Sequence, residues 1–339
     1  MRRIKNFLKN TGYELSPGDE ALTLLAQGGS DRKFYRALTD RGAFVVMTAP
    51  AFRFEIRAFL DVGAYLNGCG VGVPEIIHHD DEGQLVLLED VGDESLYALL
   101  QRTADRNQVL ELYRQVLAAL ARLQMKATPR MRTCNYLKNR SFGYEALRWE
   151  TDYFTECFLK GYCGIEIEHE SQLDDELQNL AVTIAAEPRY FMHRDFQSKN
   201  IHFKDGRVRI IDFQTATCGL LQYDLASLLK DAYAPLSPVE RQELIGFYVQ
   251  ELVDTWGLVL DAEAFTTIFH RAGLQRTMQA LGAFAFLSMR KGKSEFVQYI
   301  PAGLATLRQA LALFPEYPAL GELAAMAGLR IQPTGRVAS

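Results

Sequence analysis

The chain contains 339 residues, 48% of them hydrophobic, which predicts a sizeable core divided over roughly two domains. Its formal net charge of -5 argues against a general nucleic-acid binder, since such proteins normally carry a basic face. No apolar run approaches the ~20 residues of a membrane span, and the N-terminus shows no signal-peptide pattern. The five cysteines form no C-x-x-C pair. We therefore expect reduced thiols in a cytoplasmic protein.

A glycine pair near the N-terminus precedes an alternating segment. Residues 27–38 read Gln-Gly-Gly-Ser-Asp-Arg-Lys-Phe-Tyr-Arg-Ala-Leu, which predicts two strands joined by a loop that could cover phosphates. Backbone amides beside glycines can approach a triphosphate closely, so Gly29 and Ser30 are candidate nucleotide-binding residues. An ordinary hairpin fits this pattern equally well.

The next strand, predicted over 43–47, has the sequence Ala-Phe-Val-Val-Met. Kinase sequences carry V-A-I-K on such a strand, with a lysine that pairs with the nucleotide phosphates, and here Met47 takes the place of that lysine. Either a basic group elsewhere serves the phosphates, or metal and backbone amides suffice. Among the nearby bases Arg32, Lys33 and Arg36, we take Arg36 as the first candidate.

Two strands around a turn are predicted for residues 75–90, and the second is apolar and ends in Glu89 and Asp90. The backbone at such a strand end can face an adenine, so these two residues are candidate nucleotide-binding residues. We place the lobe boundary here, with an N-terminal nucleotide-binding lobe over 1–91 and a C-terminal lobe over 92–339 that holds the catalytic loop and the substrate site.

Apolar residues at helical spacing predict a helix over 51–67 and a mainly helical chain from residue 95 onward. Within the second region, 142–163 is rich in aromatic and acidic side chains. Core packing is the default interpretation of the rings. Carbohydrate recognition needs carboxylates beside a flat apolar surface, however, so Glu150 and Asp152 are candidate substrate residues.

The most specific signal is His-Arg-Asp-Phe-Gln-Ser-Lys-Asn at 193–200, followed by a predicted hairpin that ends in Asp-Phe. Phosphoryl transfer to an alcohol needs a carboxylate for the proton of the nucleophile, and an amide oxygen and a second carboxylate for Mg²⁺. Asp195 supplies the first group, and Asn200 and Asp212 supply the others. Asp205-Gly206 is a strong turn signal that would return Asp212 to the loop. Each residue alone could cap a turn, but their joint spacing argues against chance.

Residues 223–225 read Tyr-Asp-Leu at the start of another predicted helix. A buried Asp224 could accept amide hydrogen bonds from the catalytic loop. A simple helix cap is the alternative.

Together these residues resemble the aminoglycoside phosphotransferase and choline kinase group of small-molecule kinases, in which H-x-D-x-x-x-x-N, a D-F strand end and a Y-D-L helix recur. Within that group, further segments resemble the anomeric sugar kinases that phosphorylate N-acetylmuramate and N-acetylglucosamine in cell-wall recycling. These segments are 30–36, 45–50, 87–93, 273–276 and 281–282.

The resemblance implies an α+β, protein-kinase-like fold with a β-rich N-terminal lobe and a mainly helical C-terminal lobe. It assigns Asp195 as general base and Asn200 and Asp212 as Mg²⁺ ligands, as spacing alone does. It also implies that His193 and Asp224 support the catalytic loop and that Arg276 belongs to the substrate site.

We therefore predict a kinase that uses ATP and Mg²⁺ to phosphorylate a small molecule, with no nucleic-acid or membrane partner. The favoured acceptor is the anomeric hydroxyl of an amino sugar. An aminoglycoside or choline-like acceptor is the alternative and would need an acidic pocket. A nucleotide-binding pseudokinase, motivated by Met47, is the third hypothesis. The acidic residues that could form such a pocket are Glu150, Asp152, Glu156, Asp174 and Asp175.

Overall fold

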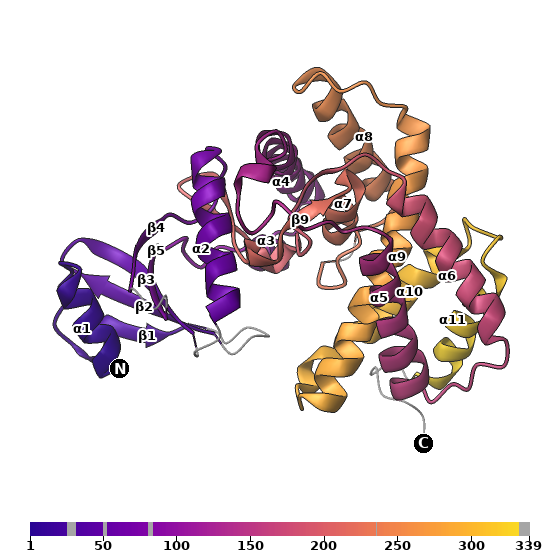
Figure 1. Cartoon of the computed structure of the whole chain (residues 1–339), viewed down its shortest axis with the longest axis horizontal. Helices are drawn as coiled ribbons and strands as arrows, with labels where there is room; N and C mark the ends of the chain where they lie inside the picture. Colours follow the sequence, from indigo (N-terminus) through magenta and orange to yellow (C-terminus); the bar gives the residue numbers. More distant parts are fainter. Residues whose placement is uncertain (26–31, 50–52, 81–83, 235, 332–339) are drawn as a thin grey trace.

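The computed structural model describes residues 1–25, 32–49, 53–80, 84–234 and 236–331. Figure 1 shows a small lobe of strands at the N-terminal end of the molecule and a larger helical lobe that carries the C-terminus. Gly29 and Ser30, two of the predicted nucleotide-binding residues, lie outside the described residues. Within these ranges no helix combines the length and apolarity needed to cross a bilayer.

The N-terminal lobe is built on an antiparallel sheet of five strands in the order β1-β2-β3-β5-β4. Alternation along β3 separates its two faces. Val46 packs with α1, whereas Val45 and Met47 face the other side and pack with α2. The elements are α1 (Arg2–Asn10), β1 (Leu22–Leu24), β2 (Lys33–Thr39), β3 (Gly42–Thr48), α2 (Arg53–Gly68), β4 (Ile76–His79) and β5 (Leu85–Glu89).

The C-terminal lobe is mainly helical, and its long central helix α9 packs against α7, α10, α5 and the π-helix η3. Its helices are α3 (Leu96–Arg102), α4 (Arg106–Ala127), α5 (Tyr144–Tyr153), η3 (Phe154–Tyr162), α6 (Glu170–Ala185), α7 (Leu221–Leu229), α8 (Pro238–Asp254), α9 (Ala262–Arg290), α10 (Ile300–Leu311) and α11 (Pro318–Arg330). Short 3₁₀-helices occur at η1 (Asp19–Ala21), η2 (Met131–Thr133), η4 (Ser198–Asn200), η5 (Phe213–Thr215) and η6 (Ser294–Tyr299).

Two small antiparallel pairs frame the H-R-D segment. Strand β6 (Tyr190–Met192), which precedes the segment, pairs with β9 (Thr217–Gly219). After the segment, β7 (Ile201–Lys204) and β8 (Arg207–Ile210) form the predicted hairpin. Asp205 and Gly206 have φ of 51° and 68° in its turn. Positive φ at both central residues is what the type I′ hairpin turn requires, so the hairpin predicted from Asp-Gly is confirmed.

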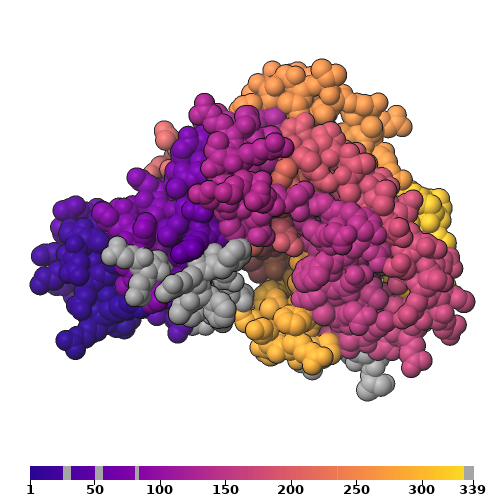
Figure 2. Space-filling view, viewed as in Figure 1, coloured from indigo at the N-terminus to yellow at the C-terminus, as the bar shows by residue number. Residues whose placement is uncertain are grey.

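The two lobes meet where α2 and the chain after it lie against the hairpin. The backbone N–H of Ile210 donates to the carbonyl of Gly72 at 2.7 Å. The rings of Phe59 on α2 and Phe213 after β8 stack with centroids 4.9 Å apart. Figure 2 shows the indigo and violet N-terminal lobe at one end of the molecule and the magenta-to-yellow helical lobe at the other.

Candidate active site

The predicted catalytic loop, residues 193–200, is anchored by Asp224 of α7. Its Oδ2 accepts from the backbone N–H of His193 at 2.7 Å, and its Oδ1 accepts from the backbone N–H of Arg194 at 2.8 Å. The carboxyl is fully buried, and burial raises its pKa to about 6 while the two backbone donors oppose the rise. The sequence-based alternative, a simple helix cap, does not describe these long-range contacts.

His193 joins the loop to the end of β8. Its ring is buried, and burial lowers its pKa, so the neutral imidazole is favoured. Nε2 lies 3.1 Å from the carbonyl oxygen of Ile211, and Nδ1 lies 3.3 Å from the backbone nitrogen of Asp195. A neutral ring protonated on Nε2 satisfies both contacts, because Nε2–H donates to Ile211 and Nδ1 accepts from Asp195.

Asp195 is the one loop carboxylate that is both fixed and accessible. Its backbone carbonyl accepts from the side-chain amide of Asn200 at 3.0 Å, and its side chain is 36% exposed. Burial of the surroundings raises the pKa of its carboxyl, while the guanidinium of Arg276 opposes that rise. A carboxylate with a raised pKa that still reaches solvent fits a general base.

Arg276 comes from α9 and reaches Asp195 of the predicted catalytic loop. Its Nη2 lies 3.3 Å from Oδ1 of Asp195. Its Nε donates to Ser227 at 3.0 Å, and its Nη1 donates to Gln279 at 2.6 Å. The residue predicted to bind substrate therefore lies beside the predicted base, in a fixed orientation.

Asn200 and Asp212 lie together at the mouth of the hairpin. The backbone N–H of Ile211 donates to the carbonyl of Asn200 at 2.9 Å, and Asp212 follows in the left-handed region with φ of 63°. Because the amide nitrogen of Asn200 is used by Asp195, its side-chain oxygen remains as the ligand atom. Within the described ranges no three His, Cys, Asp or Glu residues cluster as a metal site. One carboxylate and one amide oxygen fit Mg²⁺, which takes its other ligands from water and phosphate.

The base that reaches Asp212 is Arg32, not Arg36. Nη2 of Arg32 lies 2.9 Å from Oδ1 of Asp212. Arg36 instead binds Asp90 through Nε at 2.6 Å and Asp93 through Nη1 at 2.8 Å. Two carboxylates at the junction of the lobes thus engage the guanidinium of Arg36, and its choice as first candidate for the phosphates stays a prediction.

Glu89, at the end of β5, connects the lobes through its side chain. Glu89 Oε1 lies 3.2 Å from Nζ of Lys204 and 3.3 Å from Nε of Arg209, both on the hairpin. The backbone N–H of Glu89 donates to the carbonyl of Glu75, so it does not serve an adenine here. Nucleotide binding by this strand end stays a prediction, and it would have to use backbone groups other than the N–H of Glu89.

The two predicted substrate carboxylates, Glu150 and Asp152, are not brought together. Residues two apart on α5 point about 200° apart around the helix. Glu150 is fully buried and accepts from Arg194 at 3.1 Å and from the hydroxyl of Tyr223 at 2.9 Å. The expected contact of Glu150 with substrate is therefore corrected, because its carboxylate is buried and bonded to Arg194 and Tyr223. Burial raises the pKa of Glu150, and Arg194 opposes the rise.

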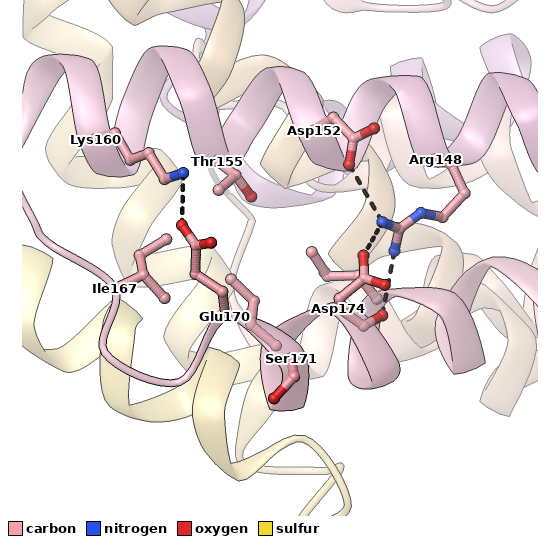
Figure 3. A pocket seen from close by; sticks show the side chains of 10 residues that line it. Arg148, Asp152, Thr155, Lys160, Ile167, Glu170, Ser171 and Asp174 are labelled. Carbon is pink, nitrogen blue, oxygen red and sulfur yellow. Dashed lines mark hydrogen bonds and ion pairs between the residues drawn. The ribbon is translucent and has the colours of Figure 1, made fainter.

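Asp152 lies on the outer side of α5, in a pocket of about 330 Å³ between α5, η3 and α6. Figure 3 shows that the charges lining this pocket pair with each other. Arg148 binds Asp152 at 3.3 Å and also Asp174, and Lys160 binds Glu170 at 2.8 Å. Asp152 thus lies away from the catalytic loop.

Sequence reasoning missed a second support of the loop. Oδ2 of Asp231 accepts from the backbone N–H of Ser198 at 2.9 Å and from its hydroxyl at 2.6 Å. The next residue, Lys199, has its Nζ 3.6 Å from the ring centroid of Tyr233 and 4.9 Å from that of Tyr299. No motif marks these partners, since Asp231 is 33 residues from Ser198.

Comparison with known proteins agrees with this geometry. Residues 21–258 match the family described as "Phosphotransferase enzyme family". A relative from Pseudomonas aeruginosa named N-acetylmuramate/N-acetylglucosamine kinase is 30% identical over 302 residues, which cover 87% of this chain and 85% of the relative. One of the same name from Neisseria meningitidis is 29% identical over 333 residues and covers 95% of both chains.

Solved structures show the same fold at low sequence identity. The choline kinase of Cryptosporidium parvum aligns over 96% of this chain and 99% of its own, with a TM-score of 0.67 and 13% identity. An amicoumacin kinase in complex with AMP-PNP and Ca²⁺ aligns over 93% and 95%, with a TM-score of 0.62 and 14% identity. The predicted two-lobe, kinase-like fold is confirmed, and the chain belongs to the phosphotransferase enzyme family of small-molecule kinases.

Proposed function

We propose that this kinase transfers the γ-phosphoryl group of ATP to the anomeric hydroxyl of N-acetylmuramate or N-acetylglucosamine. The observation that carries the reaction type is the partly exposed Asp195, fixed beside the Asn200 and Asp212 side chains. The acceptor is supported by the printed names of the relatives, which align over most of this chain. The proposal places the reaction in the cytoplasm, in the recycling of cell-wall sugars.

In this mechanism Asp195 accepts the proton of the attacking hydroxyl. Its raised pKa makes the carboxylate a stronger base than an ordinary aspartate, and the cation of Arg276 limits that rise. Asn200 and Asp212 would hold Mg²⁺, which would neutralise the charge that develops on the phosphates during transfer. Asp224 and Asp231 fix the loop backbone, so that the base does not have to be reoriented during the reaction.

Glu150 acts in this proposal as a positioning residue. Its carboxylate binds Arg194, whose backbone has φ of 77° immediately before Asp195. Tyr223 and Gln275 complete the carboxylate's hydrogen bonds at 2.9 and 3.3 Å. Because Arg194 is held at both its backbone and its side chain, Asp195 is held as well.

The charges near the outer pocket argue for an amino sugar over a polycationic aminoglycoside. A cationic acceptor would need carboxylates that are not already neutralised. Three of the five acidic residues proposed for that purpose, Asp152, Asp174 and Glu156, are instead paired with Arg148 and Lys160.

The test is ADP release with ATP and Mg²⁺ across N-acetylmuramate, N-acetylglucosamine, a kanamycin-type aminoglycoside and choline. We expect turnover with the two sugars, and its loss by at least about a hundredfold in Asp195→Asn with ATP binding retained. Turnover only with the aminoglycoside or choline would refute the sugar assignment. Full turnover in Asp195→Asn would refute the role of the base.

A further inference from the structure

We propose that Arg32 is the cation that replaces the missing lysine of β3 and that it binds the β- and γ-phosphates of ATP. This inference rests on the proposed use of ATP. It assigns Arg32 two partners in turn: Asp212 before the nucleotide and metal bind, and the phosphates afterwards.

Strand register brings Arg32 to the face where the lysine would emerge. Met47 is fully buried and pairs with Phe34 of β2, and directly opposite residues share a face of a sheet. Arg32 precedes Phe34 by two residues and therefore continues the same face. The guanidinium of Arg32 lies 5.8 Å from the centroid of the Phe34 ring, in keeping with this direction. Arg32, immediately before β2, thus supplies a cation on the same face as Met47, which stands on β3 in place of the lysine.

The reach of Arg32 is shown by its ion pair with Asp212. The two side chains approach to 2.9 Å across the lobes, although 180 residues separate them in the chain. The Arg32 side chain is 8% exposed and that of Asp212 is 35% exposed. The guanidinium therefore lies beside the proposed metal ligand and largely out of solvent, where contacts with phosphate oxygens are strongest.

The two other nearby bases do not meet these conditions. Arg36 donates to both oxygens of Asp90 and both oxygens of Asp93, so its release would leave two carboxylates without that partner. Lys33 is exposed, and its odd position in the alternation places it on the face opposite Met47. Of the three, Arg32 alone combines the correct face with contact to Asp212.

The ion pair implies an exchange when the nucleotide enters. Oδ1 of Asp212 accepts from Arg32 and also from Gln214 at 2.8 Å. A divalent ion held by Asp212 would repel the guanidinium of Arg32, and the phosphates of the nucleotide would offer that guanidinium a new bidentate partner. Arg32 would thus neutralise Asp212 in the empty protein and the phosphates in the loaded one.

The experiment measures equilibrium binding by calorimetry for ATP and for adenosine, without any sugar, with and without Mg²⁺. Proteins are the wild type, Arg32→Gln, Arg32→Lys and the matched control Lys33→Gln. Loss of a charge-assisted contact predicts that Arg32→Gln weakens ATP about ten- to hundredfold and leaves adenosine unchanged. Arg32→Lys should recover part of the ATP affinity, and Lys33→Gln should match the wild type.

Equal losses for ATP and adenosine in Arg32→Gln, or unchanged ATP affinity, would overturn the inference, since Arg32 would then be structural or idle. If Arg32→Gln does not fold, Arg32→Lys carries the comparison, and an unchanged ratio of ATP to adenosine affinity overturns it. Because no acceptor is present, failure of the amino-sugar assignment would leave this result intact. The two failures are therefore distinguishable.

Discussion

Removing the charge of Arg276 should move the pH profile of the enzyme in a direction that the structure fixes. Nη2 of Arg276 lies 3.3 Å from Oδ1 of Asp195, and this cation lowers the pKa of the carboxyl that burial has raised. In Arg276→Gln that opposing effect is lost. The pKa of Asp195 should rise further, and the acid limb of kcat/KM, where the base becomes ionised, should move to higher pH.

The size of the shift follows from the separation of the charges. Two unit charges about 4 Å apart interact by about 1 kcal/mol in water and about 4 kcal/mol at an effective dielectric of 20. The Asp195 side chain is 36% exposed, so solvent screens the pair and the lower part of that range applies. An interaction of about 1.4 kcal/mol corresponds to about one pKa unit.

The assay is kcat/KM for the sugar from about pH 4 to 9, with ATP saturating, for wild type and Arg276→Gln. Arg290→Gln is the matched control, because Arg290 is exposed at the last turn of the same helix. We expect the acid limb to move up by about one pH unit only in Arg276→Gln. A limb that stays at the wild-type position, or moves to lower pH, would refute the electrostatic role of Arg276.

Three further changes test the supports of the site. Glu150→Gln leaves Arg194 without its buried partner, so it should lower the unfolding free energy by about 2 kcal/mol and lower kcat. Asp152→Asn breaks an exposed ion pair and should lower the unfolding free energy by under about 1 kcal/mol. Denaturant titration measures both losses, and equal losses would contradict this reasoning. Gly72→Ala places a methyl group against a backbone carbonyl of β8 and should lower stability by about 1–3 kcal/mol, so an unchanged unfolding midpoint would argue against the lobe contact. Burial raises the pKa of Asp224 in the folded protein from 3.8 to about 6, so folding favours the protonated carboxyl. The contribution of Asp224 to stability should therefore fall as pH rises between those two values. A stability difference between wild type and Asp224→Asn that does not change with pH would contradict this.

Signals that act over short stretches of sequence predicted their structures well. The Asp205-Gly206 turn specifies the hairpin locally, and β7 and β8 pair across it as predicted. The spacing of Asp195, Asn200 and Asp212 is a local pattern too, because a loop and a hairpin bring the three together. Their roles in catalysis stay predictions.

Partners that depend on distant packing could not be read from the sequence. The choice among Arg32, Lys33 and Arg36 depends on strand register and on where Asp90 lies, 54 residues beyond Arg36, and the sequence shows neither. The sequence makes Glu150 a candidate substrate residue, although it is buried and accepts a hydrogen bond from Tyr223, 73 residues away in the chain. A sequence that mixes aromatic and acidic residues fits an exposed binding face and a core with one internal ion pair equally well. The sequence alone does not distinguish the two.

The most direct test of the proposed reaction is phosphorus NMR of the product made from ATP, Mg²⁺ and N-acetylglucosamine. Transfer to the anomeric hydroxyl predicts a sugar phosphate whose phosphorus signal is split by coupling to the anomeric proton, and a product that no longer reduces copper reagents. A phosphorus signal coupled instead to the two protons of the primary alcohol carbon, with the reducing end intact, would contradict the anomeric assignment.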